Sequence, residues 1–286
     1  MRVFIFGANG LLGRHIEAEF IYDGINPIHI SRKTHPTLEA KLRDPKDFIQ
    51  SLGATRDDVI INALGVTRHR IEGNLKGSDS KSVELINTRL PLALASQAQE
   101  TGTQVIQIGT DCVFSGERGD YVESDPYDAS DTYGRSKAIG ESAQGLDVIR
   151  ASSVGPSGRV GPQLWDWVKN QQKDSTIAGY SNVFWNGVTA KVHARLLLEI
   201  VKNRFPIAGT QHLVPANQIS KEQLIKLIAQ AEGRRDIRVL STHVEHSKNM
   251  TLSTENISMN SELWNLIGFP QPPDIEELIL NNSSNI

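Results

Sequence analysis

The sequence predicts an α/β fold, in which a doubly wound parallel sheet carries helices on both faces and is followed by a smaller C-terminal lobe. Short apolar runs alternate with helical patterns along the first two thirds of the 286 residues. These runs are apolar throughout, as expected for strands that are covered on both sides. A glycine-rich turn joins the first run to the first helical pattern.

Five segments have the strand pattern and are expected at 2–7, 26–31, 58–64, 103–109 and 146–152. Helices are expected between them at 11–24, 45–53, 82–102 and 133–145. Several of these helical patterns end in glycine, which is common just after a helix C-terminus. The alternation predicts one domain over residues 1–154, and the polar, glycine-containing run 67–82 is expected to be a loop.

The pattern changes after about residue 155, and residues 155–286 are expected to form the smaller lobe. A helix is expected at 188–203, within a segment (183–206) that is expected to contribute to the first domain. A strand-like run follows at 209–214. Ser220 and Gln223 have the spacing of a capping box, which predicts the start of another helix.

The composition is that of an ordinary globular protein, with 38% hydrophobic residues, 22% charged residues and a net charge of −3. This balance predicts neither a nucleic-acid partner nor a membrane-surface partner. The single cysteine, Cys112, is expected to pack in the interior, and the histidines have no metal-ligand spacing, so no metal site is predicted. The N-terminus lacks the pattern of a signal peptide, so a cytoplasmic location is expected.

The glycine pattern GANGLLG follows the first expected strand and opens the first expected helix. Gly7 would permit the tight turn, Gly10 the approach of a pyrophosphate, and Gly13 the close packing of helix and strand. Backbone N–H groups at a helix start favour phosphate binding. The sequence therefore predicts a Rossmann-type dinucleotide site formed by Gly7, Asn9, Gly10, Leu11, Leu12 and Gly13.

The end of the second expected strand indicates which dinucleotide is bound. NAD-selective sites usually carry an acidic residue there, which binds the ribose 2′-hydroxyl. This chain has Ser31, Arg32 and Lys33 instead, and two cations with a hydroxyl suit a 2′-phosphate. NADPH is therefore the predicted cofactor, with NADH as the alternative.

A candidate proton-transfer set follows the fourth expected strand. Thr110 lies just beyond that strand, and Tyr133 and Lys137 are one helical turn apart. A carbonyl reduction needs a proton donor, which Tyr133 could be if the positive charge of Lys137 lowered its pKa. Thr110 could hydrogen-bond the same substrate oxygen. The three residues together predict reduction of a carbonyl.

The chain resembles the extended short-chain dehydrogenases/reductases, and most closely their dTDP-4-dehydrorhamnose reductase branch. The matching segments run in order and include GANGLLGRHI, INALGVT, VELINTRLPLALA, IGTDCVFSG, YGRSKAIGE, VIRASSVG, FWNGVTA and LVPANQISKEQL. The resemblance implies that Thr110, Tyr133 and Lys137 are catalytic, and that Tyr133 and Lys137 also contact the cofactor. It implies a cofactor-side loop formed by Ala63, Leu64, Gly65 and Thr67, with a family asparagine at Asn87.

By the same resemblance, the substrate is a nucleotide-linked 4-keto-6-deoxy sugar used in polysaccharide biosynthesis. The substrate contacts implied are Thr110, Asp111, Val113, Tyr133, Ser153 and Trp185. Trp185 could equally fill the core between the lobes. Departures from the family pattern at Gly109, Cys112, Ser115 and Ser153 leave the sugar open between an L-rhamnose precursor and a UDP-linked N-acetyl sugar. A homodimer is a further expectation from the resemblance.

Two other functions stay open. One is a sugar-nucleotide epimerase of the same superfamily, which would keep its NAD tightly bound. The other is a non-catalytic NADP-binding subunit that regulates a partner enzyme. A 4,6-dehydratase is not expected, because such enzymes usually carry a glutamate at the position of Cys112.

Overall fold

The structure is a computed structural model that describes residues 1–31, 34–35, 45–75, 77–158 and 163–281. The five predicted strands are present as β1 (Val3–Phe6), β2 (Ile28–Ile30), β3 (Val59–Asn62), β4 (Gln104–Gly109) and β5 (Asp147–Arg150). A sixth strand, β10 (Thr210–His212), joins them in one sheet of order β10-β5-β4-β3-β1-β2. All neighbouring strands in it are parallel, which confirms the predicted fold class.

Alternate side chains of the central strands enter two separate cores. Val3 and Ile5 of β1 pack in one cluster, whereas Phe4 and Phe6 pack in the other. Successive side chains of a strand point to opposite faces, so a strand that is apolar at every position must be covered on both sides. This explains the continuous apolar runs in the sequence.

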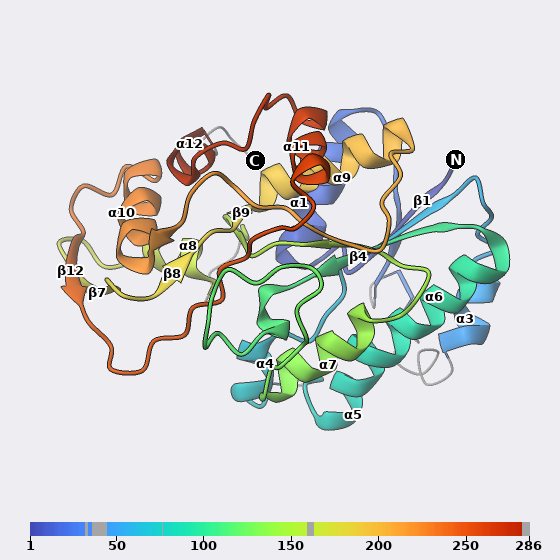
Figure 1. The fold of residues 1–286 in the computed structure, drawn as a ribbon, viewed down its shortest axis with the longest axis horizontal. Helices are drawn as coiled ribbons and strands as arrows, with labels where there is room; N and C mark the ends of the chain where they lie inside the picture. The colour runs from blue at the N-terminus through green and yellow to red at the C-terminus, as the bar shows by residue number, and fades with distance from the viewer. Residues whose placement is uncertain (32–33, 36–44, 76, 159–162, 282–286) are drawn as a thin grey trace.

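Helices cover both faces of the sheet (Figure 1). One core contains residues of α1 (Leu11–Tyr22), α9 (Ala190–Asn203) and α11 (Ile257–Leu266). The other contains residues of α3 (Pro45–Ser51) and α6 (Leu90–Thr101). Next to α6 lies α7 (Thr132–Glu141), which follows the fourth strand and carries the predicted catalytic pair.

Two predicted elements differ from the structure. The expected loop at 67–82 contains the short helix α4 (Arg68–Glu72), which an ion pair of 2.8 Å between Arg68 and Asp131 ties to the start of α7. The expected helix at 82–102 consists of α5 (Ser80–Val83), a π-helical turn η1 (Glu84–Arg89) and α6. Helical periodicity does not distinguish one π turn from an α-helix, because the turn adds one residue to an otherwise continuous helix.

The smaller lobe lies beside the sheet domain, on the left in Figure 1. It contains α8 (Leu164–Lys169), α10 (Lys221–Ala231) and α12 (Ile275–Leu280) around a shared apolar cluster. Two short strand pairs complete it: β7 (Thr176–Tyr180) with β12 (Arg238–Thr242), and β8 (Phe184–Trp185) with β11 (Ile219–Ser220). The predicted capping box of Ser220 and Gln223 starts α10.

The chain returns to the sheet domain after its first passage through the smaller lobe. A short pair, β6 (Ser153–Val154) with β9 (Val188–Thr189), leads into α9, and β10 then extends the main sheet. The division of the chain at residue 154 stays a prediction, with α9, β10 and α11 placed against the sheet. Among the described residues, no helix is long and apolar enough to cross a membrane.

Candidate active site

The predicted functional segments meet at one edge of the sheet. In a parallel sheet the carboxyl ends of all strands lie at the same edge, where doubly wound folds bind their ligands. Gly7 follows β1, Ala63 follows β3, and Thr110 follows β4. Segments separated by about a hundred residues in sequence are thereby brought next to each other.

The turn after β1 can be built only from glycine at two positions. Gly7 has a φ of +83°, and a Cβ there would lie 2.7 Å from the carbonyl oxygen of Ala63. A Cβ on Gly13 would lie 2.1 Å from the carbonyl oxygen of Gly7. Gly10 is the N-cap of α1, and no side chain caps this helix start in the described residues. The backbone N–H groups at the start of α1 fit a dinucleotide pyrophosphate.

The remaining residues of the turn and of the second strand end are only partly described. Asn9 is exposed, and Leu11 and Leu12 start α1. Ser31 is buried and hydrogen-bonds with Thr34. Arg32 and Lys33, on which the NADPH preference depends, lie outside the described residues.

Asn87 holds the predicted cofactor-side loop in place. The loop runs from Ala63 through Leu64 and Gly65 to Thr67, which starts α4. The Val66 N–H donates to Asn87 Oδ1 at 2.8 Å, and Asn87 Nδ2 donates to the Val66 carbonyl at 3.0 Å. Nδ2 also donates to Ser136 Oγ at 3.0 Å, between the two predicted catalytic residues of α7. Asn87 therefore links the loop to α7.

The start of α7 is fixed by Asp131. Its Oδ1 accepts a hydrogen bond of 3.0 Å from the Gly134 N–H, and its Oδ2 pairs with Arg68. The guanidinium of Arg68 lies 5.9 Å from the centre of the Tyr133 ring. An N-cap aspartate stabilises a helix start, so Tyr133 is presented from a rigid first turn.

The structure brings Thr110, Tyr133 and Lys137 together. The Tyr133 hydroxyl lies close enough to Thr110 for the threonine hydroxyl to influence its pKa, and the Lys137 ammonium donates to the Ile108 carbonyl of β4 at 2.9 Å. Thr110 Oγ1 also donates to Asp111 Oδ1 at 3.2 Å and accepts from the Cys112 N–H. The arrangement can hold a substrate oxygen between two hydroxyl groups.

The pKa of Tyr133 is raised in this structure, whereas the sequence predicted a pKa lowered by Lys137. Removal of the hydroxyl from solvent is the main cause, and the negative charges of Glu141 and Asp111 add to it. Hydrogen bonding with Thr110 acts in the opposite direction. Tyr133 therefore keeps its proton at neutral pH in this structure.

The predicted substrate residues occupy different environments. The side chain of Val113 is fully buried in a small cluster with Phe114 and Tyr121, in the loop after β4. Ser153 Oγ lies 2.9 Å from Nδ1 of the buried His193. Trp185 is 4% exposed and packs in the smaller lobe, which agrees with the interpretation of Trp185 as core.

Lys221 is a residue that the sequence analysis missed. Its ammonium lies 5.5 Å from the centre of the Trp185 ring, whose Nε1 donates to Ser152 Oγ at 2.9 Å. Burial lowers the pKa of Lys221, and the negative charge of Asp111 opposes this effect. No ion pair of Lys221 is found in the part of the chain that the structure describes. In the sequence, its position at a helix start gave no signal of this environment.

The structure gives no sign of a reactive thiol at the partly buried Cys112. Burial raises the pKa of its thiol far above the usual range, and the charge of Asp111 adds to this effect. A thiol that stays protonated is a poor nucleophile, so packing explains Cys112 better than chemistry does. No group of three or more metal-ligating side chains that could hold an ion is found among the described residues.

This edge of the sheet has the arrangement of the short-chain dehydrogenases/reductases, a class of oxidoreductases. The chain belongs to the family described as RmlD substrate binding domain, whose family model matches residues 1–279.

Three relatives illustrate the similarity. The spore coat polysaccharide biosynthesis protein SpsK of Bacillus subtilis is 26% identical over 234 residues, covering 81% of this chain and 71% of that protein. A dTDP-4-dehydrorhamnose reductase of Burkholderia thailandensis is 27% identical over 144 residues, covering 50% of this chain and 45% of that protein. The crystal structure of a dTDP-4-dehydrorhamnose reductase of Bacillus anthracis in complex with NADP has a TM-score of 0.75 at 20% identity, with 98% of this chain and 97% of that chain covered.

Proposed function

We propose that this protein is an NADPH-dependent reductase that converts the C4 carbonyl of a nucleotide-linked 4-keto-6-deoxy sugar into a hydroxyl group. The observation that carries the proposal is the meeting of Thr110, Tyr133 and Lys137 at the sheet edge, next to the glycine turn. Membership of the family supports it. A cytoplasmic homodimer that serves polysaccharide biosynthesis belongs to the same proposal.

The cofactor would be held by the turn Gly7–Gly13, by the first N–H groups of α1, and by the loop from Ala63 to Thr67. When bound, NADPH supplies the hydride. The relative from Bacillus anthracis, which was crystallised with NADP, supports the choice of cofactor.

Tyr133 would donate the proton to the sugar oxygen. Its hydroxyl is protonated at neutral pH and would transfer the proton as negative charge develops on that oxygen. The Thr110 hydroxyl, which donates to Asp111 in this structure, would rotate to donate to the same oxygen. Lys137 would orient the cofactor and stabilise the phenolate that remains on Tyr133.

Lys221 would bind the phosphate groups of the nucleotide-linked substrate. A half-buried ammonium without an ion-pair partner in the described residues is costly unless a ligand supplies negative charge. Whether the sugar is the L-rhamnose precursor or a UDP-linked N-acetyl sugar depends on the substrate wall, where Cys112 and Ser153 depart from the family.

The test is to mix purified protein with NADPH and a panel of 4-keto sugar nucleotides and to follow the loss of NADPH absorbance. Tyr133→Phe is expected to lower kcat by about 10²- to 10⁴-fold, the usual contribution of a general acid, while NADPH binding is retained. Tyr22→Phe, at a residue that is 93% exposed, is the matched control. If the kcat of Tyr133→Phe stays within a few-fold of the wild-type value, Tyr133 is not the proton donor.

The same experiment separates the alternatives. An epimerase would carry bound NAD after purification and turn over without added NADPH. A regulatory subunit would bind NADPH and reduce no sugar in the panel.

A further inference from the structure

A buried carboxylate lies one turn beyond Lys137 on the catalytic helix. Glu141 is 3% exposed, and its Oε1 lies 3.5 Å from the Lys137 ammonium nitrogen. Its Oε2 accepts two hydrogen bonds from Arg150, one from Nε at 3.2 Å and one from Nη2 at 3.1 Å. The carboxylate therefore lies between the proposed catalytic lysine and a guanidinium.

Arg150 cannot move away from this position without losing several partners. It is completely buried at the carboxyl end of β5, and its Nη2 also donates to the Tyr127 hydroxyl at 2.6 Å. Its guanidinium lies 5.3 Å from the centre of the Phe114 ring and 5.0 Å from that of Tyr127. A buried guanidinium is tolerated only when its donors are paired, so these contacts fix the position of Glu141 as well.

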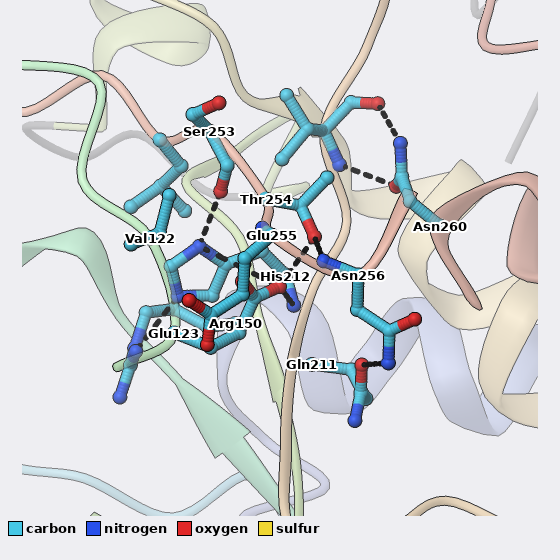
Figure 2. Close-up of polar contacts among 12 residues, drawn as sticks. Val122, Glu123, Arg150, Gln211, His212, Ser253, Thr254, Glu255, Asn256 and Asn260 are labelled. Carbon is cyan, nitrogen blue, oxygen red and sulfur yellow. Dashed lines mark hydrogen bonds and ion pairs between the residues drawn. The ribbon is translucent and has the colours of Figure 1, made fainter. Parts of the chain in front are cut away.

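The far side of Arg150 is held by a neutral histidine (Figure 2). Arg150 Nη1 lies 2.8 Å from His212 Nε2, and His212 Nδ1 lies 2.7 Å from the Ser253 carbonyl oxygen. Because a guanidinium can only donate, Nε2 accepts and the proton is on Nδ1. Burial and the charge of Arg150 lower the pKa of His212 to about 4, so it adds no positive charge at neutral pH.

A second carboxylate closes the network at its outer end. Glu123 Oε1 accepts hydrogen bonds from the backbone N–H of His212 at 3.0 Å and from Thr254 Oγ1 at 2.7 Å. Figure 2 shows that these contacts join the ends of β5 and β10 to the segment around Ser253 and Thr254. The network that ends at Lys137 is thus anchored in three parts of the chain.

One oxygen of Glu141 is left for Lys137. Oε1 is buried and accepts no hydrogen bond from the described residues, and the Lys137 ammonium is its nearest ion-pair partner. The ammonium has three N–H donors, of which one is used by the Ile108 carbonyl. With Glu141 on one side and Ile108 on another, the third donor is restricted in direction.

We infer that Glu141 is a positioning residue that orients the Lys137 ammonium toward the bound cofactor and Tyr133, and that Arg150 holds Glu141 in place. The inference rests on the proposed function, in which Lys137 contacts the cofactor and stabilises the phenolate. A purely structural ion pair would stabilise the fold without affecting the reaction.

The test uses Glu141→Gln in the full chain, with kcat, KM and the NADPH dissociation constant measured across pH. We expect kcat to fall by about 10- to 100-fold, as for a catalytic group displaced by a fraction of an ångström or more, and the NADPH dissociation constant to rise at least fivefold. The charge of Glu141 raises the pKa of Tyr133, so any alkaline limb of the kcat profile should move to lower pH in Glu141→Gln.

Two further variants separate positioning from folding. Asp58→Asn removes the buried carboxylate of the Arg2–Asp58 ion pair, at the opposite edge of the sheet. This control should lower the stability of the fold and leave the pH profile of kcat and the NADPH affinity unchanged. Glu141→Gln/Arg150→Met removes both buried charges, which often restores stability. Recovery of wild-type kcat and pH profile by this double variant would overturn the inference.

The inference and the proposed function fail in different ways. If no 4-keto sugar nucleotide is reduced by the wild-type protein, the proposed function fails. In that case the NADPH dissociation constant alone decides the role of Glu141: equal values for Glu141→Gln and wild type would contradict it.

Discussion

Asn87→Leu is predicted to loosen the loop from Ala63 to Thr67, which is proposed to contact the cofactor. Asn87 is 1% exposed, and its amide bridges the N–H and carbonyl of Val66 and the hydroxyl of Ser136. Leucine has nearly the same shape but can make none of these hydrogen bonds. The substitution therefore leaves both backbone groups of Val66 without their side-chain partner in the interior.

The expected loss of stability follows from those unpaired groups. A buried polar group left without a partner costs about 1–3 kcal/mol, so two such groups predict a loss of about 2–4 kcal/mol once local relaxation is allowed for. Because the same loop borders the predicted cofactor site, NADPH affinity should fall by about 10-fold, which is equivalent to about 1.4 kcal/mol.

Urea denaturation with and without NADPH measures both effects. Asn203→Leu is the control, because Asn203 is exposed and bonds only within its own helix turn, to Glu199, in the described residues. That control should remain within about 0.5 kcal/mol of wild type. If Asn87→Leu also stays within this range, or keeps wild-type NADPH affinity, the assigned link between loop and catalytic helix is wrong.

Two other predictions concern charge. Burial raises the pKa of Asp147 to about 6 from 3.8, so its carboxyl ionises less readily in the folded state, and the free energy of unfolding should fall as pH rises from about 4 to about 6. Allowing for the partial exposure of Asp147, the loss of stability is about 1–2 kcal/mol. Thermal unfolding of Asp147→Asn, measured between pH 4 and pH 6, should not show this loss. The same pH dependence in the variant and the wild type would contradict the assignment. Lys221→Met should raise the KM for the sugar nucleotide, and the dissociation constants of dTDP and UDP, by about 10-fold. The control is Lys226→Met, which removes an exposed ion pair of the same helix and should leave these constants unchanged. Equal affinities in the two variants would exclude Lys221 as a phosphate ligand.

The parts of the molecule that local chemistry controls were predictable. The five strands were identified because short apolar runs alternate with helical patterns. β1 is apolar at every position, and the structure divides its Val3 and Phe4 between two cores. The glycine turn was identified because Gly7 and Gly13 stand where no Cβ fits. The helical spacing of Tyr133 and Lys137 on α7 was equally local.

The sequence by itself therefore determined the fold class, the glycine turn and the candidate catalytic residues. Only the tertiary structure decided that β10 completes the sheet, that Asn87 binds Val66, and that the pKa of Tyr133 is raised. The physical reason is the separation in sequence over which each interaction acts. Backbone hydrogen bonding and apolar periodicity act over a few residues and leave a pattern in the sequence. Desolvation and buried charge pairs such as Glu141 with Arg150 depend on which segments pack together, and no local pattern encodes them.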